Sequence, residues 1–413
     1  MDIGPPRKDM PPPDAPAPAY MSDRDLYILA AATAVVTANA YYIHPIISLV
    51  AKHFGVSESM IGLVPALNQI ALALGILLLL PLGDWVSNRK LVSIFVAAQF
   101  LSIALMTFAQ DYWLFVTGST LLGFFTIAPY LLPAYVSKRV APGDLGRATA
   151  IIATGIIAGI LVARAGAGVI AEHFGWRAVY FAATGLMLAV SFALPLILEK
   201  RREGADAPAG RSYVGLIASI VPIVRNYPEI LLSGAIQALS FGIFLSIWLG
   251  LGLHLTSPEM GYGVDVVGYL AIFSIINLVT TPRLGAWADK VGPKRARLTV
   301  ASTQLLGVTL LFFFGNSLWL LMIPIVIMNI GGPLIDITTR MTFLSKASDI
   351  RTRLMTVYIV IMFLGAGAAS WAGTTAYDLA GWHGNAVLAL GMGICLWTLC
   401  LVSLRVKDGG RVA

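Results

Sequence analysis

The sequence predicts an all-α membrane protein with twelve transmembrane helices, arranged as two six-helix bundles related by pseudo-symmetry. Three observations lead to this fold class: an apolar composition, twelve long apolar stretches, and a repeat that relates the two halves of the chain. Of the 413 residues, 58% are hydrophobic and 12% are charged, whereas about a quarter of the residues of an average soluble domain are charged. This composition cannot supply a soluble surface, so it excludes a soluble enzyme.

Apolar stretches of about 20 residues or more, enough to cross a hydrocarbon core of about 30 Å, recur between short polar connectors. We place twelve of them, at residues 26–50, 59–82, 90–109, 113–137, 147–171, 176–198, 228–255, 266–287, 296–315, 318–344, 353–376 and 384–404. The long interior polar stretch EKRREGADAPAGR, residues 199–211, divides six spans from six. The predicted domains are a disordered cytoplasmic tail (1–25), an N-terminal bundle (26–198), a cytoplasmic linker (199–227), a C-terminal bundle (228–404) and a second cytoplasmic tail (405–413).

The first tail is rich in proline and alternates acidic with basic residues, a composition that neither forms a helix nor buries a core. Its basic residues are not followed at once by an apolar run, so we expect no cleaved secretory signal.

Basic residues in short loops mark the cytoplasmic side of a membrane. With the amino terminus inside, only Lys52 and Arg177 fall in outer loops, while Arg164 and Arg340 lie within spans. The opposite orientation reverses this bias, so we expect both termini in the cytoplasm. The net charge of +7 then reflects topology, and nucleic-acid binding is not expected because the bases are scattered over many loops.

Other classes of protein find little support in the residues. Cys395 and Cys400 lie too far apart along one apolar segment for a strain-free disulfide, and we find no metal-protease motif, phosphate-binding loop or paired cysteine ligands. We therefore expect neither an enzyme nor a bound cofactor or metal. A non-transporting receptor or sensor, which needs a folded module outside the membrane, is kept as the alternative from another class.

The two halves repeat at a shift of about 205 residues. Three pairs of anchors lie at this shift: Asp84 and Asp289, each followed by two basic residues; Arg147 and Arg353, at the start of spans five and eleven; and the Gly-Trp pairs at Gly175 and Gly381. Three anchors at one offset predict two parallel repeats of six helices, related by an axis along the membrane normal.

The loop after span eight, GAWADKVGPKR, resembles the loop motif of the major facilitator superfamily, with Gly285 as its first glycine and Asp289 as its aspartate. The copy after span two keeps Asp84 and the trailing bases but has Leu80 and Trp85 in place of that glycine and a base. We expect both loops to gate the cytoplasmic face, through Asp84, Arg89, Lys90, Asp289, Lys290, Gly292, Lys294 and Arg295.

Within that superfamily, the segment GRATAIIATGIIAGILVARAGAGVIAEHFGWRAVY resembles a bacterial branch grouped with arabinose-type and nucleoside-type efflux permeases. The resemblance implies a monomer of the bacterial inner membrane that exports a small organic solute in exchange for protons. Proton-coupled uptake of an organic anion is the alternative. The resemblance further implies that spans 1, 4, 7 and 10 line a cavity and that spans 2, 5, 8 and 11 join the halves. Ser119 stands where drug–proton antiporters commonly carry an arginine.

Span ten, with the segment NIGGPLIDITTR, holds the clearest candidates for transport chemistry. Asn329, Asp336 and Arg340 recur at spacings of seven and four and so share one helix face. A charge inside a span is costly and therefore indicates function by default, and the rise of about 1.5 Å per residue places Asp336 near the midplane. We expect Asp336 to carry the coupling proton and Arg340 to bind substrate, with a structural ion pair as the alternative.

Arg164 lies roughly 25 Å into span five. Its guanidinium either recognises a carboxylate or phosphate through two hydrogen bonds or locks the halves together through carbonyls at helix ends. Further candidates for substrate or proton binding are Asn39 and His44 in span one and Gln237 and Trp248 in span seven. For these the alternatives are hydrogen bonding between helices and packing.

Glycines in spans five and eleven allow close approach of helix backbones. They are Gly155, Gly159, Gly166, Gly168, Gly365, Gly367 and Gly373. We expect spans five and eleven to slide on spans eight and two, and static packing is the alternative.

Overall fold

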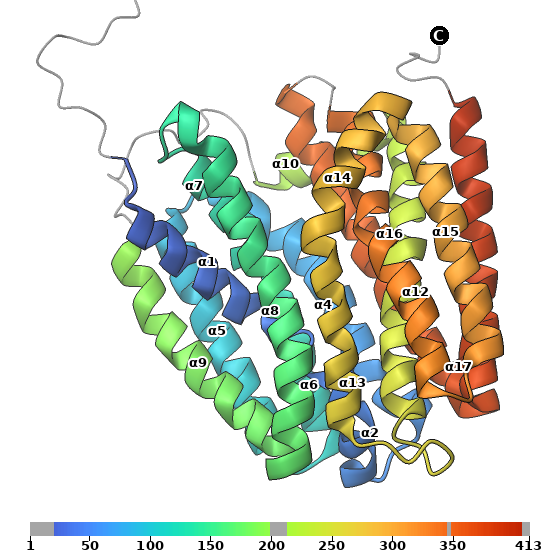
Figure 1. The fold of residues 1–413 in the computed structure, drawn as a ribbon. Coiled ribbons are helices and arrows are strands. Elements are labelled where there is room, and N and C mark those ends of the chain that lie inside the picture. Colours follow the sequence, from blue (N-terminus) through green and yellow to red (C-terminus); the bar gives the residue numbers. More distant parts are fainter. Residues whose placement is uncertain (1–19, 199–212, 345–347, 407–413) are drawn as a thin grey trace, which may run out of the picture.

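The computed structural model describes residues 20–198, 213–344 and 348–406. These residues form two helical bundles side by side, without a strand among them (Figure 1). The predicted tails and linker fall largely on residues 1–19, 199–212 and 407–413, which lie outside the described residues, so these boundaries stay predictions.

The N-terminal half contains spans one to six. Its elements are α1 (Asp23–Ala38), α2 (Ile43–Phe54), α3 (Glu58–Ile61), α4 (Leu63–Leu79), η1 (Leu80–Asp84), α5 (Asn88–Phe108), α6 (Tyr112–Phe125), α7 (Ala128–Ser137), η2 (Pro142–Asp144), α8 (Leu145–Phe174) and α9 (Trp176–Ile197). Spans one and four are each made of two helices, because four residues between Ala38 and Ile43 and two residues between Phe125 and Ala128 depart from α-helix.

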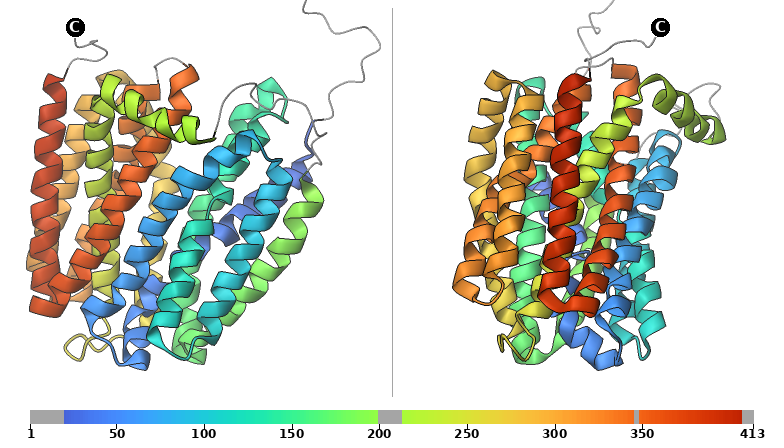
Figure 2. Two further views of the ribbon diagram at one scale, coloured as in Figure 1. Left: turned by 180° about the vertical axis from the view of Figure 1, so that it is seen from behind. Right: turned by 90° about the vertical axis from the view of Figure 1, so that its right-hand side faces the viewer.

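Two short helices, α10 (Tyr213–Ala218) and α11 (Ile220–Asn226), precede the C-terminal half. That half consists of α12 (Glu229–His254), α13 (Val264–Leu270), η3 (Ala271–Ile275), α14 (Ile276–Val291), α15 (Pro293–Phe314), α16 (Leu318–Leu344) and α17 (Ser348–Arg405). Figure 2 shows α10 and α11 lying across one end of the bundles, where the hydroxyl of Tyr213 donates to the carbonyl of Leu78 at 2.5 Å.

The described residues contain twelve spans once a helical hairpin is divided. Ten helices are long and apolar enough to cross a membrane, and the bent pair Val264–Ile275 and Thr280–Val291 adds an eleventh. One of the ten, Arg353–Arg405, is 53 residues long and contains two non-helical residues, Ala380 and Gly381. Dividing the chain there gives spans eleven and twelve. The sequence suggested a longer connector, but the φ of +58° at Gly381 makes the turn in two residues, a conformation that glycine adopts readily.

The two halves converge at one end of the molecule and diverge toward the other (Figure 1). We call the diverging end, which holds α10 and Arg405, the inner end, because the sequence predicts that it faces the cytoplasm. The opposite end, which holds α2 and the connector 255–263, is the outer end. There α8 packs on α13, and a Cβ at Gly168 would lie 2.7 Å from the carbonyl oxygen of Val264.

The second contact between the halves joins spans two and eleven, also toward the outer end. The hydroxyl oxygens of Ser59 and Thr375 are 2.9 Å apart, and the backbone N–H of Ser59 donates to Asp378 at 3.3 Å. A Cβ at Gly367 would lie 2.8 Å from the carbonyl oxygen of Ala66. The expectation that spans five and eight and spans two and eleven join the halves is therefore confirmed.

The glycines of span five serve two different contacts. Gly168 faces the other half, whereas Gly155 and Gly159 face Ala30 and Ala34 of α1 in their own half, with a Cβ 2.4 Å and 2.3 Å from the respective carbonyl oxygens. Gly166 has open space beside it. Of these four, only Gly168 lies where the halves slide in the predicted cycle.

The predicted membrane orientation is tested with single cysteines in a version that lacks Cys395 and Cys400. We expect Lys90→Cys and Lys294→Cys to react with a membrane-impermeant maleimide only from the cytoplasmic side, because both residues lie in the first turn of a helix at the inner end. Glu259→Cys, in an exposed outer connector, is the matched control and should react only from outside. Labelling of Lys90→Cys or Lys294→Cys in intact cells would contradict the orientation.

Candidate functional site

Asp336 and Arg340 lie one turn apart on α16 and form an ion pair, as their spacing predicts. Nε of Arg340 donates to Oδ1 of Asp336 at 2.8 Å, and the hydroxyl of Tyr358 on α17 donates to the same oxygen at 2.6 Å. The side chain of Asp336 is 26% exposed and that of Arg340 is 32% exposed. The pair is therefore reached by water in this arrangement although it lies inside a membrane-spanning helix.

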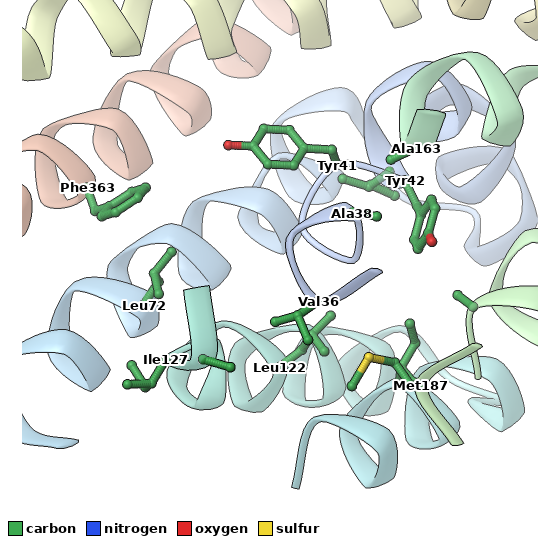
Figure 3. Packing of buried hydrophobic residues seen from close by; sticks show 14 of the residues in the cluster. Val36, Ala38, Tyr41, Tyr42, Leu72, Leu122, Ile127, Ala163, Met187 and Phe363 are labelled. Carbon is green, nitrogen blue, oxygen red and sulfur yellow. The ribbon is translucent and has the colours of Figure 1, made fainter. Parts of the chain in front are cut away.

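Tyr130 of α7 connects the N-terminal half to this ion pair. It lies within electrostatic range of Asp336 and Arg340, and its ring centroid is 6.2 Å from that of Phe363 on α17. Figure 3 shows Phe363 facing the helices of the N-terminal half. We call Asp336, Arg340, Tyr358 and Tyr130 the Asp336 cluster, which brings together spans four, ten and eleven.

A second group surrounds Arg164 on α8, whose side chain is only 2% exposed. Its Cζ lies 4.5 Å from the ring centroids of both Phe244 and Trp248 on α12, and 5.3 Å from that of Tyr41. Tyr41 belongs to the interrupted segment of span one, from which Tyr41 and Tyr42 point to opposite sides (Figure 3). The rings of Phe244 and Trp248 come from the other half, so Arg164 lies at the contact between the halves.

Four buried polar atoms of this second group have no hydrogen-bond partner. Nε and Nη2 of Arg164 are buried without a hydrogen-bond partner, and so are both ring nitrogens of His44, whose ring centroid is 5.3 Å from that of Tyr41. Arg164 makes no hydrogen bond or ion pair with any residue that the structure describes, so the bonds to carbonyls, which were one of the two alternatives, are not formed in this arrangement. We call Arg164, His44, Tyr41, Phe244 and Trp248 the Arg164 cluster.

The magnitudes show why this arrangement is unusual. A desolvated cation–π contact contributes about 2 kcal/mol, whereas each buried donor left without an acceptor costs about 1–3 kcal/mol. The aromatic rings compensate part of the charge of Arg164 but satisfy none of its N–H groups. The Arg164 cluster is therefore electrostatically incomplete.

The remaining candidates in spans one, seven and ten are dispersed. Asn39 is buried with both amide atoms unpaired, and Oε1 of Gln237 is also unpaired. Asn329 is fully engaged in its own half, because its Oδ1 accepts from Ser274 of η3 and its Nδ2 donates to Ile325, both at 2.9 Å. The structure thus joins Asp336 with Arg340 and Trp248 with Arg164, and it separates Asn329 from the ion pair.

Sequence reasoning missed Tyr130, Tyr358 and a second buried arginine, Arg297. Arg297 on α15 is 2% exposed and donates to Ser403 at 2.8 Å and to Thr339 at 3.3 Å. These bonds join spans nine, ten and twelve within one half, so Arg297 stabilises that half. No spacing rule reveals such contacts, because they join separate helices.

The two loop motifs lie at the inner end. Asp289 is exposed on the last turn of α14 and makes no hydrogen bond or ion pair with the described part of the chain. Gly292 follows with a φ of +89°, which favours glycine and lets α15 begin at once. Lys290 and Arg295 are exposed, and Nζ of Lys294 donates to the carbonyl of Val406 at 2.5 Å. The second motif is thus fully formed while its aspartate is unengaged.

The first motif differs in backbone structure. Leu80–Asp84 form the 3-10 helix η1, and the hydroxyl of Ser87 caps α5 by accepting from the backbone N–H of Lys90, the residue after Arg89. The side chain of Asp84 is not among those that the structure describes, so its predicted role stays a prediction.

We expect Asp289→Asn to impair transport more than Asp84→Asn. In the predicted closed inner end, each aspartate faces a helix terminus, where an anion complements free N–H groups and the positive end of the dipole. Only the second loop keeps the neighbouring Lys290 and Gly292, so its contact should be the stronger. Flux into proteoliposomes measures both variants. Equal and mild losses would argue against gating by these loops.

Two six-helix repeats that meet at one end, with the buried Arg164 between them, have the architecture of a secondary transporter. The family is established by a direct match. The Major Facilitator Superfamily model matches residues 29–370 and 230–412, so the chain belongs to that superfamily. This assignment makes it a multi-pass membrane transporter and not an enzyme.

Relatives with curated names are themselves transporters. The uncharacterized transporter YgaY of Escherichia coli O157:H7 is 26% identical over 384 residues, which cover 92% of this chain and 94% of YgaY. The probable transporter SCO4007 of Streptomyces coelicolor is 28% identical over 379 residues, or 91% and 87% of the two chains. The multidrug resistance protein MdtG of Citrobacter koseri is 24% identical over 228 residues, 53% of this chain and 55% of MdtG.

Solved structures show the same fold at low identity. A variant of the nucleoside transporter NupG superposes with a TM-score of 0.70 at 13% identity, covering 92% of this chain and 98% of NupG. A D-xylose–proton symporter gives a TM-score of 0.67 at 16% identity, covering 94% and 98% of the two chains. The predicted all-α fold of this superfamily is therefore confirmed.

Proposed function

We propose that this protein is a monomeric proton-coupled exporter of a small organic solute, placed in a bacterial inner membrane with both termini in the cytoplasm. It works by alternating access: the solute enters from the inner end, the halves rock about the site between them, and the outer end opens. The convergence of the halves at the outer end supports this cycle, because a state open to the cytoplasm has this arrangement in the proposed orientation.

The observation that carries proton coupling is the partly exposed Asp336 inside span ten. Its carboxylate is held by Arg340 and Tyr358 and yet is 26% exposed. In the proposed exchange, the charged form of Asp336 is neutralised by Arg340 and permits solute binding, and a proton arriving from outside converts Asp336 to its neutral form and displaces the solute. Proton and solute then occupy the site in turn.

Relatives support export over uptake. MdtG is named as a multidrug resistance protein, and this name favours outward transport of organic compounds by a protein similar to this chain. Ser119 supplies no fourth-span charge, because a serine hydroxyl is neutral, and it donates to the carbonyl of Val64 at 3.2 Å. We therefore assign the coupling to Asp336.

Uptake of an organic anion with protons is the second candidate. It is favoured by Arg340, which loses its counter-charge when Asp336 is neutral and is then available to an anion. The two functions differ in the sign of their pH dependence. Solute affinity rises with pH for the exporter, because the charged form of Asp336 binds solute, and falls with pH for the symporter.

The test is reconstitution into liposomes that enclose a pH-sensitive dye. Solutes are first selected by their ability to raise the thermal stability of the purified protein, since a ligand that binds only the folded state stabilises it. A selected solute should then move protons in the opposite direction to itself, and a protonophore should abolish its accumulation. Solute flux that is unchanged after the proton gradient is dissipated would show an uncoupled facilitator.

A further inference from the structure

The proton-coupled exchange leaves the Arg164 cluster without a use. We propose that Arg164 and His44 form an anion subsite that holds the carboxylate of a small aromatic or otherwise flat organic acid, so that the exported solute is an organic anion. This inference rests on the proposed function, because it names the class of solute that the transporter carries.

The geometry of the free atoms specifies the ligand. Nε and Nη2 of Arg164, which are the two buried atoms without a partner, are the side of the guanidinium that presents two parallel N–H groups. A planar carboxylate accepts from both at once. His44 is 0% exposed, has no partner at either ring nitrogen, and lies within electrostatic range of Arg164. A neutral imidazole carries one N–H, which supplies a third donor.

The charge of the subsite favours a single negative charge. Arg164 forms no ion pair with any described carboxylate, so one carboxylate neutralises it, while a phosphate with two charges would leave one uncompensated in a dry site. The ring centroids of Phe244 and Trp248 lie 4.5 Å from Cζ of Arg164. The two rings provide a flat apolar surface beside the N–H groups of the guanidinium. These rings suit the apolar body of an aromatic acid.

The position of the subsite gives it a place in the transport cycle. Phe244 and Trp248 belong to the C-terminal half, and His44 and Arg164 to the N-terminal half, so parting of the halves at the outer end separates the rings from the guanidinium. In the present arrangement the rings cover Arg164. As the halves begin to part, the rings withdraw, and the donors of Arg164 become available to solute that has entered from the inner end.

The Asp336 cluster cannot bind the carboxylate of the solute in the exchange that we propose. Arg340 is bonded to Asp336 whenever the carboxylate is charged, which is the form that permits solute binding. The carboxylate of the solute therefore needs another arginine, and Arg164 is the arginine of the N-terminal half that has free donors at the contact between the halves.

The experiment uses purified full-length protein and three probes at equal ionic strength: benzoate, its neutral amide benzamide, and phenyl phosphate. We expect benzoate to raise the melting temperature by about 2–4 °C and benzamide to leave it unchanged. Arg164→Gln should abolish the benzoate response. Arg164→Lys, which keeps the charge but not the two parallel N–H groups, should reduce it by at least about tenfold in apparent affinity.

Arg297→Gln is the matched control. Arg297 is as buried as Arg164, but its Nη1 and Nη2 donate to Thr339 and Ser403, so its replacement should lower the baseline melting temperature and leave the benzoate response intact. If neither Arg164 variant folds, the unmodified protein still tests the proposal, because an anion subsite requires a larger rise in melting temperature with benzoate than with benzamide. Equal responses to those two probes, or a larger response to phenyl phosphate, would overturn the subsite. A benzoate response that survives Arg164→Gln would also overturn it and leave Arg164 a structural residue.

Failure of the subsite and failure of the proposed function give different results. Benzoate binding that depends on Arg164, without proton movement in liposomes, would keep the subsite and refute proton-coupled export. Proton-coupled flux of a solute that binds independently of Arg164 would do the reverse.

Discussion

Asp336→Asn is expected to abolish accumulation driven by a pH gradient, down to the level of protein-free liposomes, while solute binding and solute exchange persist. Asparagine keeps the shape of the side chain and a carbonyl oxygen for the Tyr358 hydroxyl, but it cannot take up a proton. The measurement is flux with and without a pH gradient, together with exchange of labelled solute at equal pH. Glu259→Gln is the control, because it removes an acid from an exposed connector and should change none of these rates.

A purely structural ion pair predicts a different pattern. Removing one partner of a fully buried pair costs about 3–5 kcal/mol, and the cost is smaller here because the side chains of Asp336 and Arg340 are 26% and 32% exposed. Each single variant, Asp336→Asn or Arg340→Gln, would then unfold at lower temperature, and the double variant would regain both stability and coupled transport. Recovery of pH-driven accumulation in the double variant would place the coupling site elsewhere.

Gly168→Ala is expected to stop transport without unfolding the protein. The new Cβ would lie 2.7 Å from the carbonyl oxygen of Val264, and overpacking of this kind costs about 1–3 kcal/mol. Because the contact joins the two halves, the cost falls on the arrangement in which the outer end is closed. A shift of 1.4 kcal/mol changes a population about tenfold, so the outer-open state should dominate.

Two other glycines of α8 serve as controls that distinguish a shift between conformations from a loss of stability. Gly155→Ala places a Cβ 2.4 Å from the carbonyl oxygen of Ala30 within one half, so it should lower thermal stability, whereas Gly166→Ala meets open space and should be neutral. Spin labels at Lys52 and Asn316, two exposed outer positions on different halves, report the opening. An unchanged distance distribution in Gly168→Ala would contradict the assignment of Gly168 to the moving contact.

The sequence predicts much of the fold because exposure to lipid requires long apolar segments and basic residues in loops mark the cytoplasmic side. The Gly-Trp anchors show how far the repeat extends: Gly175 and Gly381 both have positive φ and both start the final helix of their half. Trp176 and Trp382, one residue on, are both buried. Asp336 and Arg340 were predictable as neighbours because they lie on one helix, where spacing fixes geometry.

What the sequence did not predict depends on how separate helices are rotated against each other. Tyr358 reaches Asp336 from another span, and the rings of Phe244 and Trp248 reach Arg164 from the other half. The interruption of span one near Tyr41 has a local cause, because Pro45, four residues later, cannot donate to the carbonyl of Tyr41. Which helix the Tyr41 ring then contacts does not follow from that proline. Such contacts follow from helix packing, which periodicity along one chain does not record.

The shortness of the outer connectors has a practical consequence. Three residues or fewer join the outer ends of most neighbouring helices of the described chain, and the turn at Ala380 and Gly381 uses two. The nine-residue connector between His254 and Val264 is therefore the main epitope that the outer face offers to a binding protein. An antibody fragment that recognises this connector would hold α12 and α13 at a fixed angle and, because α13 packs on α8, would act as an inhibitor that never enters the membrane.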